Sequence, residues 1–140
     1  MKTLSVSDQE FLAAFEARAL TAAEFHHREH LRLAYIYLSL HPFDEALAKM
    51  ETGLRNLLVH LGAPASKYHH TLTEAWLRAV QHFMERSGPT KDFAQFLETA
   101  GPLLDKNIMG THYSTDLLWS DEARVAFVEP DLQPIPRHAG

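Results

Sequence analysis

The fold of this chain is decided by residues 21–42, which read TAAEFHHREHLRLAYIYLSLHP. Thr21 and Glu24 have the spacing of a capping box, in which two side chains each bond a backbone N–H at the start of a helix. Pro42 ends the stretch, because the residue before a proline is pushed out of the helical conformation. Between these signals, apolar residues recur at helical spacing. The stretch therefore predicts one long amphipathic helix over residues 22–40.

Similar start and stop signals occur along the rest of the chain. Ser7 and Glu10 form another capping box, and Gly62 and Gly88 follow apolar stretches that have helical spacing. These signals predict two further long helices over residues 8–19 and 42–61, and a fourth that begins between Ser66 and Thr71 and ends at Ser87. Shorter helical pieces are predicted from Thr90 to Gly101 and over 103–108, 115–119 and 120–127. An extended proline-containing tail is predicted over about 128–140. This pattern predicts an all-α fold, with three to four long helices as a bundle closed by short C-terminal helices.

The composition excludes several classes of protein. The chain has 140 residues, of which 46% are hydrophobic, and this suits a single helical domain over residues 1–140. A net charge of -5 argues against nucleic-acid binding and against adhesion to an anionic membrane. Cysteine is absent, which excludes disulfides and thiolate metal sites. Without an apolar leader or a long apolar run, the expected location is the cytoplasm.

Histidine is the unusual residue, with ten copies in the chain. His27 and His30 share the apolar face of the helix predicted over residues 22–40, whereas His26 falls about 100° away. Two imidazoles on a buried face need hydrogen bonds, acidic partners or a metal ion. Either one of them is a satisfied core residue beside a wet groove, or both are metal ligands.

A third ligand is expected in the segment that begins YHHTLTEAW at Tyr68. If the fourth helix begins near Ser66, His69 lies in its first turn and is able to face His27 and His30. If the helix begins at Thr71, His69 lies in a loop, and a role as a simple helix cap is also open. His70 has the spacing of an ordinary exposed pair with Glu74.

These residues lead to our first hypothesis, a small soluble helical metalloprotein. His27, His30 and His69 would bind one divalent transition metal ion, with Thr73, His112 and Tyr113 beside its open coordination position. Nitrogen ligands suit Zn, Fe, Ni or Cu, and the sequence does not choose among them. The open position would take water or an unknown small molecule, so a metal-dependent enzyme is one form of this hypothesis.

Residues 26–30 also match H-x-x-E-H, the inverted zinc-protease signature, in which His26 and His30 would bind zinc and Glu29 would activate water. This match requires His26 to face inward, against the helical periodicity, so His26, Glu29 and His70 are weaker candidates for the site.

The segments FHHREHLRLA from Phe25 and YHHTLT from Tyr68, with the closing run from Tyr113 to Leu132, resemble a family of small uncharacterised bacterial all-helical proteins. That family has histidine at the positions of His27, His30 and His69, and an acidic residue is more usual where this chain has His70. The resemblance implies the same three-histidine set and no particular activity. A looser architectural likeness links the chain to DinB-type bundles, which hold a metal with three histidines.

The second hypothesis is a non-catalytic helical module that binds a small ligand or a partner protein, with structural histidines. Phe25 and Ile36, at outer positions of the predicted helix, would form an interface or pack under the short C-terminal helices. The oligomeric state is left open.

Overall fold

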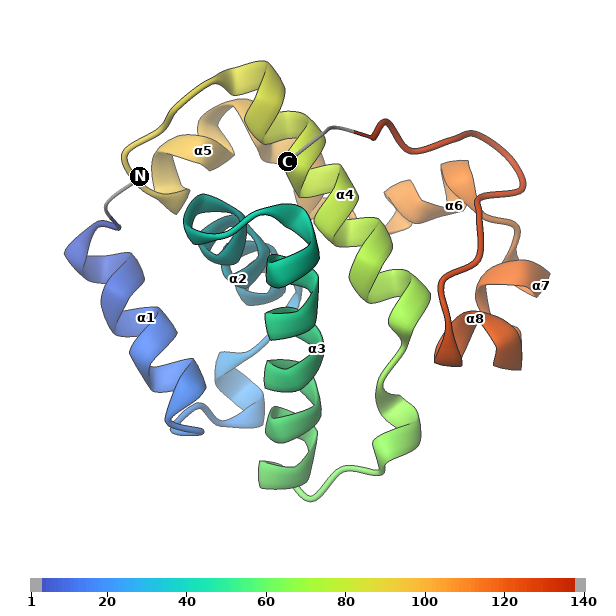
Figure 1. Cartoon of the computed structure of the whole chain (residues 1–140), viewed down its shortest axis with the longest axis horizontal. Helices are drawn as coiled ribbons and strands as arrows, with labels where there is room; N and C mark the ends of the chain where they lie inside the picture. Colours follow the sequence, from blue (N-terminus) through green and yellow to red (C-terminus); the bar gives the residue numbers. More distant parts are fainter. Residues whose placement is uncertain (1–3, 138–140) are drawn as a thin grey trace.

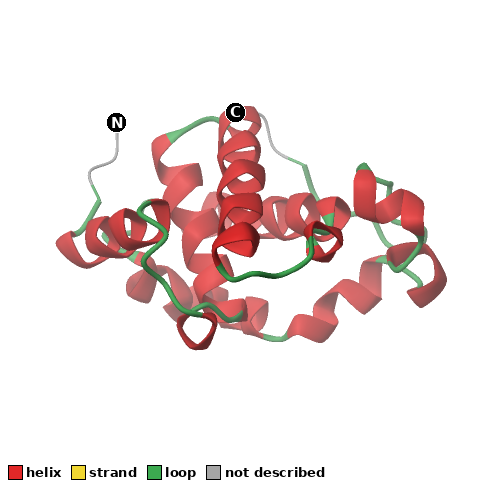
Figure 2. Ribbon diagram, turned by 90° about the horizontal axis from the view of Figure 1, so that it is seen from below, coloured by secondary structure: helices red, strands yellow, loops and turns green. Residues whose placement is uncertain are grey.

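The structure is a computed structural model that describes residues 4–137. It confirms the all-α fold, and no strand occurs among the described residues (Figures 1 and 2). The α-helices are α1 (Val6–Glu16), α2 (His27–Leu40), α3 (Phe43–His60), α4 (His70–Ser87), α5 (Phe93–Ala100), α6 (Met109–His112), α7 (Thr115–Leu118) and α8 (Asp121–Val125). Short 3₁₀ turns are η1 (Ala22–Glu24), η2 (Ala65–Lys67), η3 (Gly101–Leu104) and η4 (Lys106–Ile108). In the part that the structure describes, no helix is both long and apolar enough to span a membrane.

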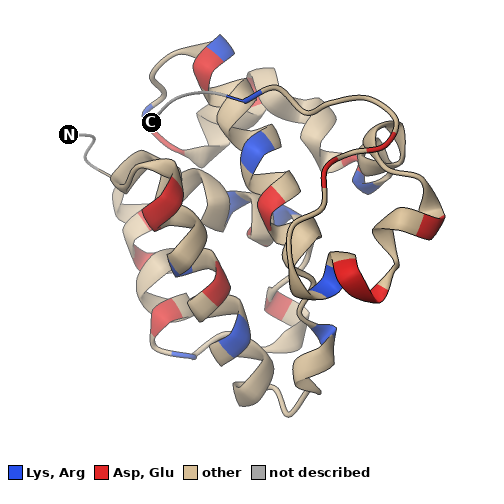
Figure 3. Cartoon of the chain, turned by 45° about the vertical axis from the view of Figure 1, so that its right-hand side comes forward, with Lys and Arg blue, Asp and Glu red and all other residues tan. Residues whose placement is uncertain are grey.

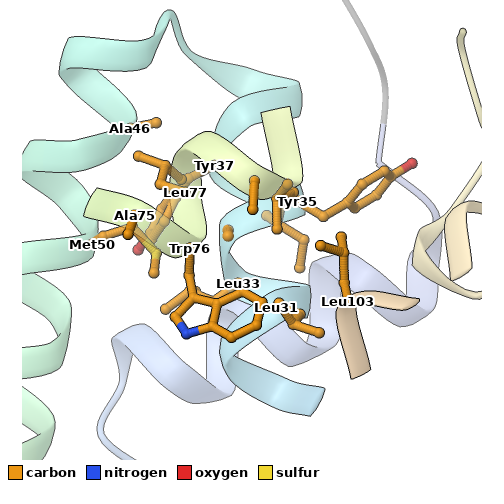
Figure 4. Packing of buried hydrophobic residues seen from close by; sticks show 14 of the residues in the cluster. Leu31, Leu33, Tyr35, Tyr37, Ala46, Met50, Ala75, Trp76, Leu77 and Leu103 are labelled. Carbon is orange, nitrogen blue, oxygen red and sulfur yellow. The ribbon is translucent and has the colours of Figure 1, made fainter. Parts of the chain in front are cut away.

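Helix α2 lies at the centre of the bundle and packs against α3 and α4 (Figure 1). Six of its residues are buried with Trp76 and Leu77 of α4 and Met50 of α3 in a core of which Figure 4 shows a part: Leu31, Leu33, Ala34, Tyr35, Ile36 and Tyr37. Ile36 belongs to this core, because none of its surface is exposed. The expectation that Ile36 occupies an outer position is therefore wrong, and Phe25 is half-buried in a stack on Phe15.

The predicted ends of the long helices are largely confirmed, because strong local signals set them. Pro42 is the N-cap of α3, and positive φ angles of 70° at Gly62 and 72° at Gly88 lie just after α3 and α4. Glycine adopts this left-handed conformation without the cost that a Cβ atom imposes.

Five predicted local details are wrong. Ser5, and not Ser7, caps α1 by accepting from the N–H of Asp8, and Asp92, and not Thr90, caps α5. Residues 103–108 divide between η3 and η4, and the last helix is shorter than predicted. The predicted helix over 22–40 is interrupted at Phe25, which has φ −128° and ψ 95°. The Thr21 and Glu24 capping box is present but opens only the short turn η1.

The buried carboxylate of Asp8 connects three helices. Its Oδ1 accepts from Nε of Arg32 on α2 at 2.9 Å, and its Oδ2 accepts from the backbone N–H of Phe93 at the start of α5 at 3.0 Å. Asp8 itself is 1% exposed. A buried charge with both oxygens bonded fixes the position of α1 against the bundle.

A second close approach joins α1 to α3 at Gly53. A Cβ atom added there would lie 2.5 Å from Cε2 of Phe15, which is 3% exposed. Only glycine leaves room for that ring at this position.

The C-terminal segment covers the end of the bundle where α4 begins (Figure 1). Thr71 joins the two parts, because its hydroxyl donates to the Ala126 carbonyl and accepts from the Val128 N–H. The hydroxyl of Tyr113 donates to the Val128 carbonyl, and the Leu132 N–H donates to the carbonyl of His112. The predicted extended tail is therefore held against the bundle as far as Ile135, which is 6% exposed, and residues 138–140 lie outside the described residues.

Candidate functional site

The interruption at Phe25 decides how the histidines of α2 are placed. His26 becomes the N-cap residue, and its backbone N–H donates to Oε1 of Glu29 at 2.9 Å. The imidazole of His26 is largely exposed, at 69% of its side-chain surface. The H-x-x-E-H pattern is therefore accounted for by a helix start, in which Glu29 bonds the cap and His26 points to solvent.

His27 lies in the first turn of α2, where three elements meet. Its Nε2 is 2.8 Å from the Leu103 carbonyl, so this nitrogen carries the proton and donates. Its ring packs edge-on against Trp76 of α4, with 4.5 Å between the ring centroids. The hydrogen bond fixes the tautomer and leaves Nδ1 with a free lone pair.

His30 is the least satisfied histidine of the site. Its ring meets the edge of Phe25 at 6.4 Å, and neither of its nitrogens has a hydrogen-bond partner among residues 4–137. Loss of hydration, followed by the nearby His27, lowers the pKa of His30 to about 4. The imidazole is therefore neutral at physiological pH, with one N–H and one lone pair left for another molecule.

His69 is the N-cap residue of α4, which is one of the alternatives that the sequence leaves open. Its Nδ1 accepts from the Leu72 N–H at 3.1 Å, and its Nε2 donates to the Leu118 carbonyl at 2.7 Å. Burial is the main cause that lowers the pKa of His69. Both ring nitrogens are thus engaged, and neither is available as a ligand in this arrangement.

Two neighbouring cavities surround these side chains. The aromatic cavity, of about 780 Å³, is lined by Phe25, His26, His27, His30, Leu72, Trp76, Lys106, Asn107, Met109, Gly110, Tyr113, Thr115, Leu118 and Trp119. The leucine cavity, of about 330 Å³, is lined by Ala22, Phe25, His30, Leu54, Leu57, Leu58, Leu61, Lys67, Tyr68, His69, Leu72 and Thr73. Phe25, His30 and Leu72 belong to both linings, so the two cavities meet at these three side chains.

The structure does not bring the three predicted metal ligands into one cavity. His27 and His30 line the aromatic cavity, whereas His69 lines the leucine cavity with His30. Within residues 4–137, no group of three or more His, Asp or Glu side chains is arranged to hold a metal ion. The three-histidine metal site stays a prediction.

The other predicted site residues are divided between the cavities and the outside. Tyr113 lines the aromatic cavity, and burial raises the pKa of its hydroxyl. Thr73 lines the leucine cavity and donates to the carbonyl of His69. His112 lines neither cavity. Its Nδ1 donates to the carbonyl of Gln133 in the C-terminal tail.

His70 lines neither cavity and belongs to a network that adjoins the leucine cavity through Tyr68. The hydroxyl of Tyr68 is 2.9 Å from Nδ1 of His70, and Nε2 of His70 is 3.6 Å from Glu74. Arg78 also bonds Glu74, at 2.6 Å. The expected pair between His70 and Glu74 is present, but it is largely buried and not exposed as predicted.

Sequence reasoning missed most of the cavity lining. Lys106, Asn107, Met109 and Gly110 reach the site from the short elements η4 and α6, and Trp119 follows α7. None of these residues stands in a motif.

No family model matches the chain, and no curated protein or solved structure was found to be similar to it.

Proposed function

We propose that this protein binds a small organic molecule in the aromatic cavity. The observation that carries the proposal is the His30 imidazole, a neutral ring without a hydrogen-bond partner in the wall of a cavity of about 780 Å³. Ligand pockets of roughly 300–1,000 Å³ that are mostly apolar, with few polar groups, are typical of small-molecule sites.

The lining supplies both parts of such a site. Trp119, which is 51% exposed, offers a flat apolar surface, and the buried Trp76 forms part of the wall. Burying an aromatic surface against a ligand is favourable, and stacked rings add about 0.5–1.5 kcal/mol beyond area. His30 then fixes the orientation of the ligand, because its unused nitrogens accept or donate one hydrogen bond each.

A metal centre is the competing hypothesis, and the hydrogen bonds of His69 weigh against it. To bind a metal ion, His69 would have to give up either the cap of α4 or its bond to Leu118. Losing a buried hydrogen bond costs about 1–3 kcal/mol. A small molecule in the aromatic cavity needs neither bond to break.

Anilinonaphthalene sulfonate tests the proposal, because its fluorescence rises in an apolar site. We expect saturable binding of one molecule per chain, with energy transfer from the two tryptophans, both of which line the cavity. Gly110 belongs to the cavity lining, and a Cβ atom added there meets no atom within 4 Å, so the ring of Gly110→Phe has room beside the cavity and should abolish binding. Gly101→Phe enters equally open space away from the cavity and should leave binding unchanged. Equal binding by the two variants would refute the proposal.

A further inference from the structure

The aromatic cavity has more rings than aliphatic side chains in its lining. Seven of its fourteen lining residues carry an aromatic or imidazole ring, whereas three have an aliphatic or thioether side chain: Leu72, Met109 and Leu118. Stacked and edge-on pairs of rings gain more free energy than the area that they bury provides. The walls therefore suit a flat ring better than a flexible aliphatic chain.

Trp119 is the most exposed of the large aromatic side chains in this lining. It is 51% exposed, whereas Trp76 is 5% exposed. His69 meets the indole of Trp119 edge-on, with 5.4 Å between ring centroids, and Cζ of Arg124 lies 5.5 Å from the centre of the ring. These two contacts orient the indole, and the rest of its surface is available to a flat ligand.

The polar groups that are still unused in this lining include donors and acceptors. His30 keeps one N–H and one lone pair, and Nδ1 of His27 keeps a lone pair. The backbone N–H of Asn107 donates to Asp105, but its side-chain amide has no hydrogen-bond partner among residues 4–137. A carboxamide offers both a donor and an acceptor. A ligand that carries an N–H and a carbonyl or ring nitrogen on its edge matches these groups, and a hydrocarbon ring does not.

The charges beside the cavity have both signs. Figure 3 shows Asp and Glu interspersed with Lys and Arg along the ribbon. Lys106 belongs to the lining, but the carboxylate of Asp105 accepts from the Asn107 N–H at 2.9 Å, and Glu29 accepts from the N–H of His26. Neither sign of charge is selected by these surroundings, so the loss of hydration of a charged ligand would not be offset. An uncharged ring is therefore favoured.

The rings, the unused donors and acceptors and the mixed charges point to one class of ligand. We propose that the aromatic cavity takes an uncharged, flat heteroaromatic molecule whose edge carries a hydrogen-bond donor and an acceptor, as in a ring lactam. The face of this molecule lies on Trp119, and its polar edge meets the unused groups of His30 and Asn107. This inference rests on the proposed function, because it names the ligand class of that same site.

Three lactams of similar size test the inference. Carbostyril is a flat bicyclic lactam, its fully saturated analogue has the same lactam edge on puckered rings, and N-methylcarbostyril keeps the flat rings but lacks the N–H. Each is titrated into nitrogen-labelled protein, and the dissociation constant is read from the indole N–H signals of Trp76 and Trp119. We expect carbostyril to bind more tightly than either analogue by about two- to tenfold, the factor that ring stacking or one hydrogen bond provides. A carboxylate added to the carbostyril ring should not tighten binding.

Two variants assign the parts of the ligand to two side chains. Asn107→Leu, at an exposed position, should weaken carbostyril by about two- to tenfold and change N-methylcarbostyril less. Asn56→Leu is its control, because Asn56 lines neither cavity, and it should change neither ligand. Trp119→Leu keeps an apolar side chain without a flat ring, so the preference for carbostyril over its saturated analogue should disappear. That preference is a ratio measured within one variant, with Trp76 as the reporter, so a change in stability does not imitate it.

The outcomes distinguish this inference from the proposed function. If anilinonaphthalene sulfonate binds but carbostyril binds no more tightly than its saturated and N-methyl analogues, or an added carboxylate tightens binding, the ligand class is wrong and the small-molecule site stands. Carbostyril binding that is unchanged in both Asn107→Leu and Trp119→Leu would also overturn the inference. If neither anilinonaphthalene sulfonate nor any of the lactams binds the unaltered protein, both the inference and the proposed function fail.

Discussion

The imidazole of His27 packs edge-on against the indole of Trp76, with 4.5 Å between ring centroids and 64° between ring planes. The same imidazole donates to the carbonyl of Leu103, so one side chain joins α2, α4 and η3. Both rings line the aromatic cavity, and the short elements around Gly110 and Trp119 supply another part of its lining.

The first prediction concerns the buried carboxylate that holds α1. Asp8→Ala leaves Arg32 and the N–H of Phe93 without their partner, and we expect a loss of about 3 kcal/mol in the free energy of unfolding. Urea denaturation measures it. Glu51→Ala, which removes an exposed pair with Arg55, should cost less than about 1 kcal/mol. Equal losses would mean that Asp8 does not act as a buried anchor.

The second prediction concerns the close approach of α1 and α3. Gly53→Ala forces the ring of Phe15 to move, and we expect a net loss of about 1–2 kcal/mol, although alanine favours a helix. Gly101→Ala adds its Cβ atom in open space and should be neutral or slightly stabilising. Thermal or urea unfolding measures the free energy of unfolding of both variants. A Gly53→Ala variant that is more stable than the unaltered protein would contradict the close packing of Phe15 on Gly53.

The third prediction separates a cap from a metal ligand at His69. His69→Ala removes the cap of α4 and the bond to Leu118, and should cost about 2 kcal/mol. His69→Asn keeps the cap and should cost about half as much. Both losses should be the same in the presence of zinc or of a chelator.

Elemental analysis of untagged protein complements these variants. A stoichiometric metal that disappears in His69→Ala and in His30→Ala would establish the three-histidine metal site instead.

The fourth prediction is a pH dependence that comes from His30. Its pKa is lowered to about 4 in the folded protein, whereas the unfolded chain titrates near 6.5. Between pH 6.5 and pH 4, the imidazole is protonated in the unfolded state but stays neutral in the folded state. The free energy of unfolding is therefore at its full value above about pH 6.5 and falls as the pH is lowered. His69, whose pKa is also lowered, acts in the same direction.

Urea denaturation at about pH 7.5 and about pH 5 measures this effect. We expect His30 to account for about 1–2 kcal/mol of the loss, a value discounted because the ring is partly exposed to the cavity. His30→Gln should lose correspondingly less stability than the unaltered protein. His60→Gln, at an exposed position, should behave like the unaltered protein. A His30→Gln profile identical to that of the unaltered protein would contradict the lowered pKa.

Much of the fold is predictable because local signals set it. Pro42, Gly62 and Gly88 each act on the backbone within a few residues, so the ends of α3 and α4 follow from the sequence. Where two neighbouring residues are both suitable N-caps, the local capping preference does not say which one is used. Ser5 and Ser7 are both suitable caps for α1, and tertiary packing of Asp8 decides in favour of Ser5.

The candidate site was only half predictable. His27 and His30 were expected to share a face, and both do line one cavity. The break at Phe25 was missed, because the capping box at Thr21 is also compatible with a short turn. Gly110 and Trp119 lie far along the chain from α2, and no local periodicity indicates where such short elements dock. The cavity is completed by packing between segments that are far apart in the sequence, and local sequence patterns do not indicate such packing.

The most direct test of the central claim follows the two indole N–H signals in a proton–nitrogen correlation spectrum. The chain has two tryptophans, Trp76 and Trp119, and both line the aromatic cavity. On titration with anilinonaphthalene sulfonate, both indole signals should shift in the unaltered protein and in Gly101→Phe, and neither should shift in Gly110→Phe. Indole signals that stay in place while backbone signals elsewhere move would contradict binding in the aromatic cavity.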